Sequence, residues 1–530
     1  MLSVSVENIF LTGSAPQPLE KLYKTVTHLC HLKHEADTFG RLSIVVQTNV
    51  DKLIRNDILP FVENEYLLYN LAKAWTVFKE KIDLIRAIYL ELDRTNVNGL
   101  ICYSVWEMSL KSVKETLLPN TFIMNKVAEV ILSNIKLSRV GENIQDNEFK
   151  IIIQMLDDLG YFQAKLESKI LEQTRKFFYE QSREKINELS LSEYVDYVRN
   201  VMKSEDDFFK NMCPMILEQN RLILSAQLIG EHKQTILDSK NLTLSFKELQ
   251  FILIHQLFTL FQKIPGGIDR LNEVFFVYVH DHGLSIVKCD KDIIQELLDF
   301  KEQVDDILVK SFNSQEPFSC SIQSAFKKIV NTNRNRVAEL IAKYIDSKLR
   351  TGYKDFNEKQ FEALLDKVML FFRYNDCKDI FEAFYKQYLS KRLLIGKSAS
   401  VDAEKTMLTK LKIECGHEFT VTLEGMFKDL EISRDLNENF SRSLCLTKLT
   451  PKIDMIVNTL TDTNWPNRPA YNFKIPKFME DYEEAFKKFY LAKFASRKLT
   501  WGRDLGHCLL TFYLKNVRFF SIILFFFINL

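Results

Sequence analysis

The tripeptide Gly396-Lys397-Ser398 is the stretch of this sequence that most resembles a site for chemistry. It matches the end of the phosphate-binding loop G-x-x-x-x-G-K-[ST], in which glycines let successive backbone N–H groups surround a phosphate. The position that needs the first glycine holds Lys391, and residues 381–392 carry apolar side chains at helical rather than strand spacing. We therefore predict no nucleotide site. Gly396 is expected to end one helix in the left-handed conformation, and Ser400 to cap the next.

Other residues could in principle bind a metal or attack a substrate: His28, Cys30, His31 and His34, then Cys415 with His417, and His280 and His282 around Asp281. The first group has no second pair of ligands nearby in sequence to complete a tetrahedral site. No activating neighbour of the thiol in the second group is evident, and its Glu-Cys-Gly-His sequence is typical of a helix end. We predict no catalytic residue, no cofactor site and no metal site.

The composition indicates a helical, intracellular protein. The 530 residues include 71 Lys plus Arg and 70 Asp plus Glu, and this balance disfavours direct binding to nucleic acid or to a membrane surface. Only 15 glycines and 11 prolines interrupt the chain, which favours long helices. The nine cysteines are scattered without a C-x-x-C pair, and the N-terminus lacks a signal peptide, so we expect a reducing compartment.

Apolar residues recur at helical spacing along most of the chain, for example at Ile82, Ile85, Tyr89 and Leu92. This pattern predicts a mainly α fold, an elongated stack of helices followed by a helical bundle. After about residue 440 prolines become frequent, and residues 498–501 and 507–514 read as two strands that begin an α/β module. The final run FFSIILFFFINL is shorter than the roughly 20 apolar residues of a membrane span. We expect it not to be the natural end of a fold, in preference to a buried terminal strand.

Residues 380–440 resemble the homology region of the cullin family. Four motifs carry the resemblance: F-x-x-x-Y-x-x-x-L-x-x-R-L-L from Phe381, G-K-S-A-S-x-D-A-E from Gly396, K-L-K-x-E-C-G from Lys410, and L-E-G-M-F-K-D from Leu423. The second motif is most similar to the cullin-4 branch. Shorter matches extend the resemblance from about residue 70 to about residue 514.

The resemblance implies a fold and a function. The expected parts are a stalk of cullin repeats over residues 1–350, a helical bundle over 351–475, the start of an α/β module over 476–514, and a hydrophobic tail outside the family over 515–530. Cullins are non-catalytic scaffolds of ubiquitin ligases in cytoplasm and nucleus. They hold a substrate adaptor, a multi-propeller protein in the cullin-4 branch, at one end and a RING-box protein at the other.

The resemblance also implies which residues meet these partners. The helix that begins at Ser104 would face the adaptor, and we expect Ser109, Ser112 and Val113 to be exposed there. The two predicted strands would pair with a strand of the RING-box protein, which assigns to that interface Lys498, Leu499, Trp501, Leu509 and Thr511.

Family members continue into winged-helix modules, where a lysine in the context I-V-R-x-M-K-x-R-K receives a ubiquitin-like activator. This sequence contains no such context and therefore no neddylation lysine. We expect weak or absent binding of the RING-box protein and an impaired ligase. Two alternatives stay open: a truncated cullin that binds the adaptor non-productively, and an unrelated helical-rod tethering protein.

Overall fold

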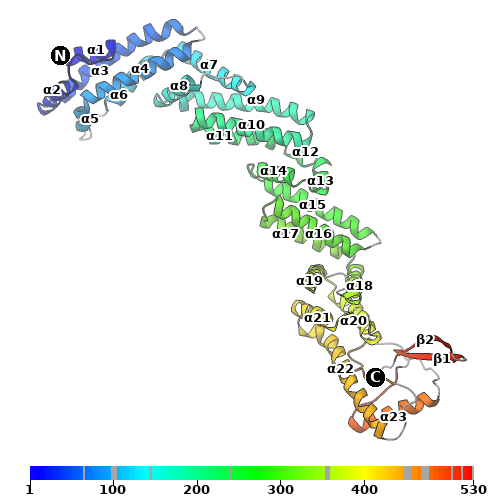
Figure 1. The fold of residues 1–530 in the computed structure, drawn as a ribbon. Coiled ribbons are helices and arrows are strands. Elements are labelled where there is room, and N and C mark those ends of the chain that lie inside the picture. The colour runs from blue at the N-terminus through cyan, green and yellow to red at the C-terminus, as the bar shows by residue number, and fades with distance from the viewer. Residues whose placement is uncertain are drawn as a thin grey trace. The chain divides into compact units, whose positions relative to one another are not determined.

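The computed structural model describes residues 1–63, 66–96, 104–141, 146–238, 240–289, 292–352, 358–446, 455–466, 475, 477–502, 505–514 and 517–527 (Figure 1). Side chains are described for these residues except 95–96, 146, 444–446, 478 and 505–527. The chain divides into two compact units, Met1–Leu271 and Asn272–Leu530. Helices dominate both units, which confirms the mainly α prediction.

The described residues of the first unit form helices joined by turns, with no strand among them. Its α-helices are α1 (Leu2–Thr12), α2 (Leu19–His31), α3 (Glu35–Leu53), α4 (Leu67–Ile88), α5 (Leu90–Asn96), α6 (Val105–Leu117), α7 (Thr121–Val140), α8 (Asp146–Asp158), α9 (Glu167–Glu188), α10 (Leu191–Met212), α11 (Leu217–Ser225), α12 (Lys233–Leu237), α13 (Lys240–Lys247) and α14 (Phe251–Phe261). Short π-helices lie at η1 (Ile54–Ile58), η3 (Phe162–Leu166) and η5 (Ala226–Gly230), and 3-10 turns at η2 (Leu59–Phe61) and η4 (Pro214–Ile216).

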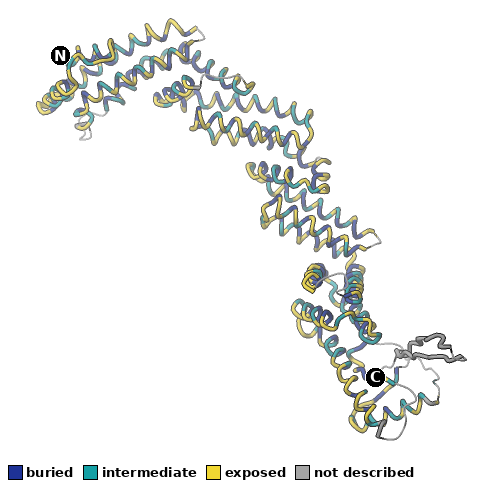
Figure 2. Tube along the Cα trace, viewed as in Figure 1, coloured by how far each residue is buried: buried dark blue, intermediate teal, exposed yellow. Residues whose placement is uncertain are grey.

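Local sequence explains how these helices begin. Ser104 and Ser190 each accept a hydrogen bond from the backbone N–H three residues later, while Glu107 and Glu193 bond back to the serine N–H groups. These two capping boxes satisfy donors that a helix start leaves free. The buried stripes then merge into one apolar core that runs from α1 to Ile216, with the exposed residues on the opposite faces (Figure 2).

The second unit contains helices and one small sheet. Its elements are α15 (Gly267–Lys288), which begins at the boundary, α16 (Ile293–Lys310), α17 (Glu316–Thr332), α18 (Arg334–Thr351), α19 (Glu358–Tyr374), α20 (Lys378–Ile395), α21 (Val401–Cys415), α22 (His417–Leu446), α23 (Lys477–Lys493), β1 (Leu505–Leu514) and β2 (Val517–Phe527). A separate apolar cluster joins α22 to α23 and includes Phe440, Phe486 and Leu499.

The sheet corrects two expectations about the C-terminal part. β1 and β2 pair antiparallel, from Leu505 with Phe527 to Leu514 with Val517. Residues 507–514 are in a strand as predicted, but residues 498–501 are not in a strand. The apolar segment that was not expected to complete a fold supplies β2 up to Phe527, because an adjacent strand satisfies its backbone groups.

Candidate functional sites

The Gly-Lys-Ser stretch is a turn between α20 and α21, as predicted. α20 ends at Gly396, whose φ of 66° and ψ of 27° are left-handed, and its N–H bonds back to the carbonyls of the last turn. The Oγ atom of Ser400 accepts a hydrogen bond of 3.3 Å from the N–H of Ala403 at the start of α21. Since a helix precedes the glycine, the arrangement differs from a phosphate-binding loop.

The family motifs converge on one buried arginine. Arg392 on α20 is fully buried, and its Nε and Nη2 atoms donate to Glu404 Oε1 and Oε2 at 2.7 and 2.9 Å. Its Nη1 atom donates to Asp346 Oδ1 on α18 at 2.6 Å, and the Ser398 hydroxyl donates to Glu404 Oε1 at 2.8 Å. Burial opposes the charge of Arg392, but hydrogen bonds and the charge of Glu404 outweigh it, so the pKa of the guanidinium is raised.

Close backbone packing fixes the same turn against α18. The N–H of Ala399 donates to the carbonyl of Leu349 at 3.1 Å. Gly352 lies directly against this residue: a Cβ atom at position 352 would come within 2.3 Å of the Ala399 Cβ, and its φ of +60° also favours glycine. The motif therefore joins α18, α20 and α21, and Arg392, Glu404, Asp346 and Ser398 are hydrogen-bonded to one another.

A second polar centre holds the segment 455–466 on α22. The Asp429 carboxylate accepts hydrogen bonds from the Thr461 N–H at 2.9 Å, the Thr461 hydroxyl at 2.8 Å and the Trp465 indole N–H at 2.9 Å. Asn464 Nδ2 adds a longer bond of 3.4 Å to the same carboxylate. Gly425 leaves room for Asn464, because a Cβ atom there would meet its side chain at 2.4 Å.

Two further side chains of α22 bind the backbone of this segment. Asn437 donates to the carbonyl of Val457 and accepts from its N–H, both at 2.8 Å. Ser433 accepts from the Thr459 N–H at 2.7 Å and lies 3.1 Å from its carbonyl. We call Asp429, Ser433 and Asn437 the α22 clasp. It fixes the start of the C-terminal module on the helical body.

The expectation that Ser109, Ser112 and Val113 are exposed is wrong. They are 0%, 4% and 7% exposed, because this face of α6 packs on α3 and α4. The Ser109 hydroxyl donates to the Val105 carbonyl at 2.7 Å, so the polar group needs no outside partner. The exposed face of α6 carries Glu107, Lys111, Lys114 and Glu115.

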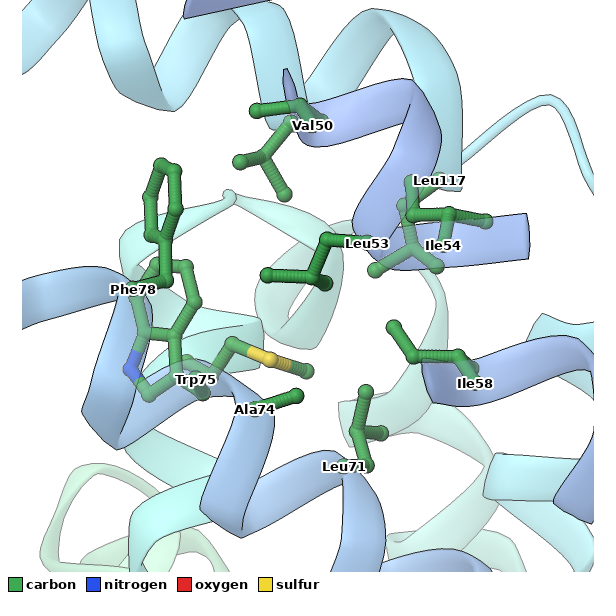
Figure 3. A pocket seen from close by; sticks show the side chains of 11 residues that line it. Val50, Leu53, Ile54, Ile58, Leu71, Ala74, Trp75, Phe78 and Leu117 are labelled. Carbon is green, nitrogen blue, oxygen red and sulfur yellow. The ribbon is translucent and has the colours of Figure 1, made fainter. Parts of the chain in front are cut away.

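Val113 instead lines an apolar pocket between α3, η1, α4, α6 and α8 (Figure 3). Figure 3 shows Trp75 and Phe78 of α4 on one side of the pocket, Ile54 and Ile58 on the other, and Leu71 of α4 at the bottom of the view. No polar side chain is among its lining residues. The pocket is therefore part of the core rather than a place for a charged or hydrogen-bonding ligand.

The residues assigned to the RING-box interface divide into three kinds. Lys498 is exposed, whereas Leu499 is buried in the α22–α23 cluster and Trp501 packs against that cluster. The Trp501 and Phe486 rings lie 6.1 Å apart, edge to face. Leu509 and Thr511 lie on β1, where the structure describes the backbone but not the side chains. Leu499 and Trp501 thus contribute to the core beneath any interface.

The histidine and cysteine groups show little sign of reactivity. His28 and His31 are exposed, while Cys30 is buried, and burial raises the pKa of its thiol. Burial also raises the pKa of the Cys415 thiol, which opposes its activation as a nucleophile. Within the described ranges, no three His, Cys, Asp or Glu side chains are grouped as metal ligands. No helix of the described part is both long and apolar enough to cross a membrane.

The Arg392 and Asp429 networks were not predicted from the sequence, although one signal was available. Phe381, Tyr385, Leu389 and Arg392 lie on one face of α20, so the arginine extends a buried stripe. A charge in such a position requires a buried partner. The α22 clasp had no comparable signal, because its partners Val457, Thr459 and Thr461 lie 20, 26 and 32 residues further along the chain.

Comparisons with known proteins match both parts of the chain. The cullin alpha solenoid domain matches residues 1–437, and the cullin alpha+beta domain matches residues 459–527. The second match includes residues 515–527, so the expectation that this tail lies outside the family is wrong there. The helical repeats are those of a cullin solenoid.

Three curated relatives are similar over nearly the whole chain. Cullin-4A of Mus musculus is 35% identical over 96% of this chain and 68% of its own length, and Cullin-4A of Homo sapiens is 35% identical over 93% and 65%. Cullin-4 of Dictyostelium discoideum is 33% identical over 96% and 64%. The chain spans about two thirds of the length of these relatives. With both domain types matched in order, the chain belongs to the cullin family.

Proposed function

We propose that this cullin is a non-catalytic scaffold of a ubiquitin ligase complex, which bridges a substrate adaptor and a RING-box protein for ubiquitin-dependent protein degradation. The observation that carries the proposal is the match of both cullin domain types to one chain. A scaffold accelerates transfer by holding two reacting partners close together and needs no reactive side chain of its own. Cytoplasm and nucleus are the compartments proposed for this activity.

We propose that the adaptor, of the multi-propeller type in a cullin-4-like protein, binds the exposed face of α6. Ser109, Ser112 and Val113 are buried, so the adaptor site is assigned instead to the opposite face of the helix, which carries Lys111 and Lys114. The double change Lys111→Glu and Lys114→Glu should strongly reduce adaptor capture in a pull-down from residues 1–530. Lys176→Glu on α9, whose side chain is 73% exposed, is the control and should bind as the parent does. Unchanged capture by the double variant would contradict the proposed face.

We propose that the RING-box protein adds a strand near the α22 clasp. Val457 and Thr459 bond to α22, and Ile456, the residue before Val457, is 78% exposed. In an extended segment, alternate residues direct their backbone groups to the opposite side, where a partner strand can bond. Lys498 and residues of β1 such as Leu509 and Thr511 belong to the same proposed interface.

Co-purification with a RING-box protein tests the scaffold directly. A stoichiometric complex that transfers ubiquitin to an adaptor-bound substrate would support the scaffold proposal and would contradict the expectation of weak or absent RING-box binding. Capture of the adaptor without the RING-box protein would favour non-productive binding instead. Residues 1–530 contain no I-V-R-x-M-K-x-R-K context, so mass spectrometry of this segment should find no activator-linked lysine.

A further inference from the structure

A buried ion pair joins the last turn of α7 to α9, α10 and α11 in the first unit. Arg139 Nε and Nη2 donate to Glu205 Oε1 and Oε2 at 2.9 and 3.0 Å, and Nη2 also donates to Thr174 Oγ1 at 2.8 Å. The two charged side chains are 4% and 7% exposed. Asn220 Nδ2 donates to Glu205 Oε2 at 3.4 Å and completes the group.

Arg139 is well placed to control the direction of its helix. The apolar core holds α7 from Ile123 to Ile135. In the last turn, Leu137 and Val140 are 39% and 69% exposed, so the buried anchor of this turn is the arginine side chain. Its guanidinium carbon lies 5.3 and 5.0 Å from the ring centres of two aromatic residues of α9, Phe177 and Phe178.

The chemistry of the pair favours a geometric role. Apolar contacts have no preferred direction, so they allow neighbouring helices to slide or tilt with little loss of buried area. A bidentate arginine–carboxylate pair has a fixed planar geometry. Because removing two charges from water is costly, a buried pair adds little to stability compared with apolar residues of similar size, whereas it can select one arrangement.

We propose that the Arg139–Glu205 pair sets the angle at which α7 meets the α9–α11 layer. It would thereby fix the direction of helices α1–α6 relative to that layer within the first unit. The consequence for ubiquitin transfer rests on the proposed scaffold function, but the geometric role does not. Arg139 and Glu205 act in this proposal as positioning residues.

Distance measurements between spin labels test the geometry in residues 1–530. Spin labels are attached to genetically encoded keto amino acids at Lys24 on α2 and Lys203 on α10, which avoids the native cysteines. The distance between the two labels reports the direction of helices α1–α6 relative to the α9–α11 layer. The parent should give one narrow distance peak. The double variant Arg139→Met and Glu205→Leu should lose that peak and give a broader or shifted distribution, with an unchanged midpoint of thermal unfolding.

Two further variants make the result specific. Arg221→Met with Asp206→Leu removes an exposed pair between α10 and α11, with side chains 44% and 32% exposed, and should keep the parent's narrow peak. Arg139→Lys retains the charge but not the bidentate geometry, and it covers the case in which the double variant does not fold. It should also broaden the distribution. A parent-like peak in the folded Arg139 variants would overturn the proposal.

The functional consequence has its own measurement. The double variant should capture the adaptor as well as the parent does, while ubiquitin transfer to a bound substrate falls. If the parent itself captures no adaptor, the proposed scaffold function fails, but the distance result still decides the role of the pair. If transfer is unchanged although the distances broaden, the link between this angle and transfer is refuted.

Discussion

Arg392 illustrates how one side chain can organise a family motif without doing chemistry. Its charge is buried, and its hydrogen bonds reach Glu404 and Asp346, which lie 12 and 46 residues away in sequence. The helical spacing of α20 places Arg392 in line with its buried stripe but does not reveal its partners. The partners depend on how α18, α20 and α21 pack, and that information is not local.

Removing one member of this network should be costly. Arg392→Met leaves the fully buried Glu404 carboxylate without its cation, while Asp346 keeps its hydrogen bond from Arg350. We therefore expect a loss of about 3–5 kcal/mol in the free energy of unfolding. Urea denaturation measures the change. The neighbouring Lys391→Met is the control, because Lys391 is exposed and its loss should change stability by no more than about 0.5 kcal/mol. Equal effects of the two changes would contradict a buried charge network.

The corrected position of Val113 gives a second test at this scale. Val113→Ala enlarges the apolar pocket of Figure 3 and should lower stability by about 2 kcal/mol, without weakening adaptor capture. Lys114→Ala, one residue along the same helix, should leave stability within about 0.5 kcal/mol of the parent. Reduced adaptor capture with unchanged stability in Val113→Ala would instead restore the original, exposed interpretation.

At the scale of elements, the α22 clasp can bond the extended segment because four residues of a helix and two residues of an extended chain span nearly the same distance. Asp429, Ser433 and Asn437 recur every four residues, a rise of about 6 Å, while their partners Thr461, Thr459 and Val457 recur every two, about 6.6 Å. Side chains on one face of a helix can therefore bond every second residue of an antiparallel extended segment. The sequence shows the four-residue spacing on α22, but the bound segment is identified only when the chain folds back.

Asp429→Ala should release this segment. Loss of the carboxylate leaves the buried indole N–H of Trp465 without a partner, at a cost of roughly 1–3 kcal/mol, whereas the exposed Thr461 can bond to water instead. Hydrogen exchange monitored by mass spectrometry should become faster in residues 455–466 and stay unchanged in α15–α18. The exposed Asp435 on the same helix provides the control change, Asp435→Ala. Persistent protection of residues 455–466 in Asp429→Ala would show that other contacts hold the segment.

At the scale of the whole molecule, a buried tyrosine predicts sensitivity to alkali. Burial raises the pKa of Tyr89 to about 12, above the ordinary value of about 10. Between these values the unfolded chain loses the proton and the folded chain keeps it. The contribution of Tyr89 to the free energy of unfolding is therefore complete below pH 10. It is lost as the pH rises towards 12, and the total loss is about 2.7 kcal/mol.

The variant Tyr89→Phe should lose less stability than the parent as the pH rises. Urea midpoints measured from pH 9 to pH 11 should fall less steeply for Tyr89→Phe than for the parent. Tyr179→Phe changes a tyrosine that is 42% exposed and should retain the parent's slope. Identical slopes for all three proteins would show that another group controls alkaline unfolding.

The sequence by itself determined the features that depend on near neighbours along the chain. These are the helical class, the turn at Gly396 with its cap at Ser400, the strand at residues 507–514 and the family motifs. Helix periodicity, caps and left-handed glycines need only a few consecutive residues, so one sequence contains the required information.

The tertiary structure decided which face of each element is covered and which distant groups meet. It buried Ser109 and Val113 under α3 and α4, paired the C-terminal apolar run with β1, and brought Asp346 to Arg392. Helical spacing cannot distinguish a small polar residue in a close helix contact from one in solvent, because its hydroxyl can bond its own helix in both. Burial and partners are set by long-range packing, which the local pattern does not contain.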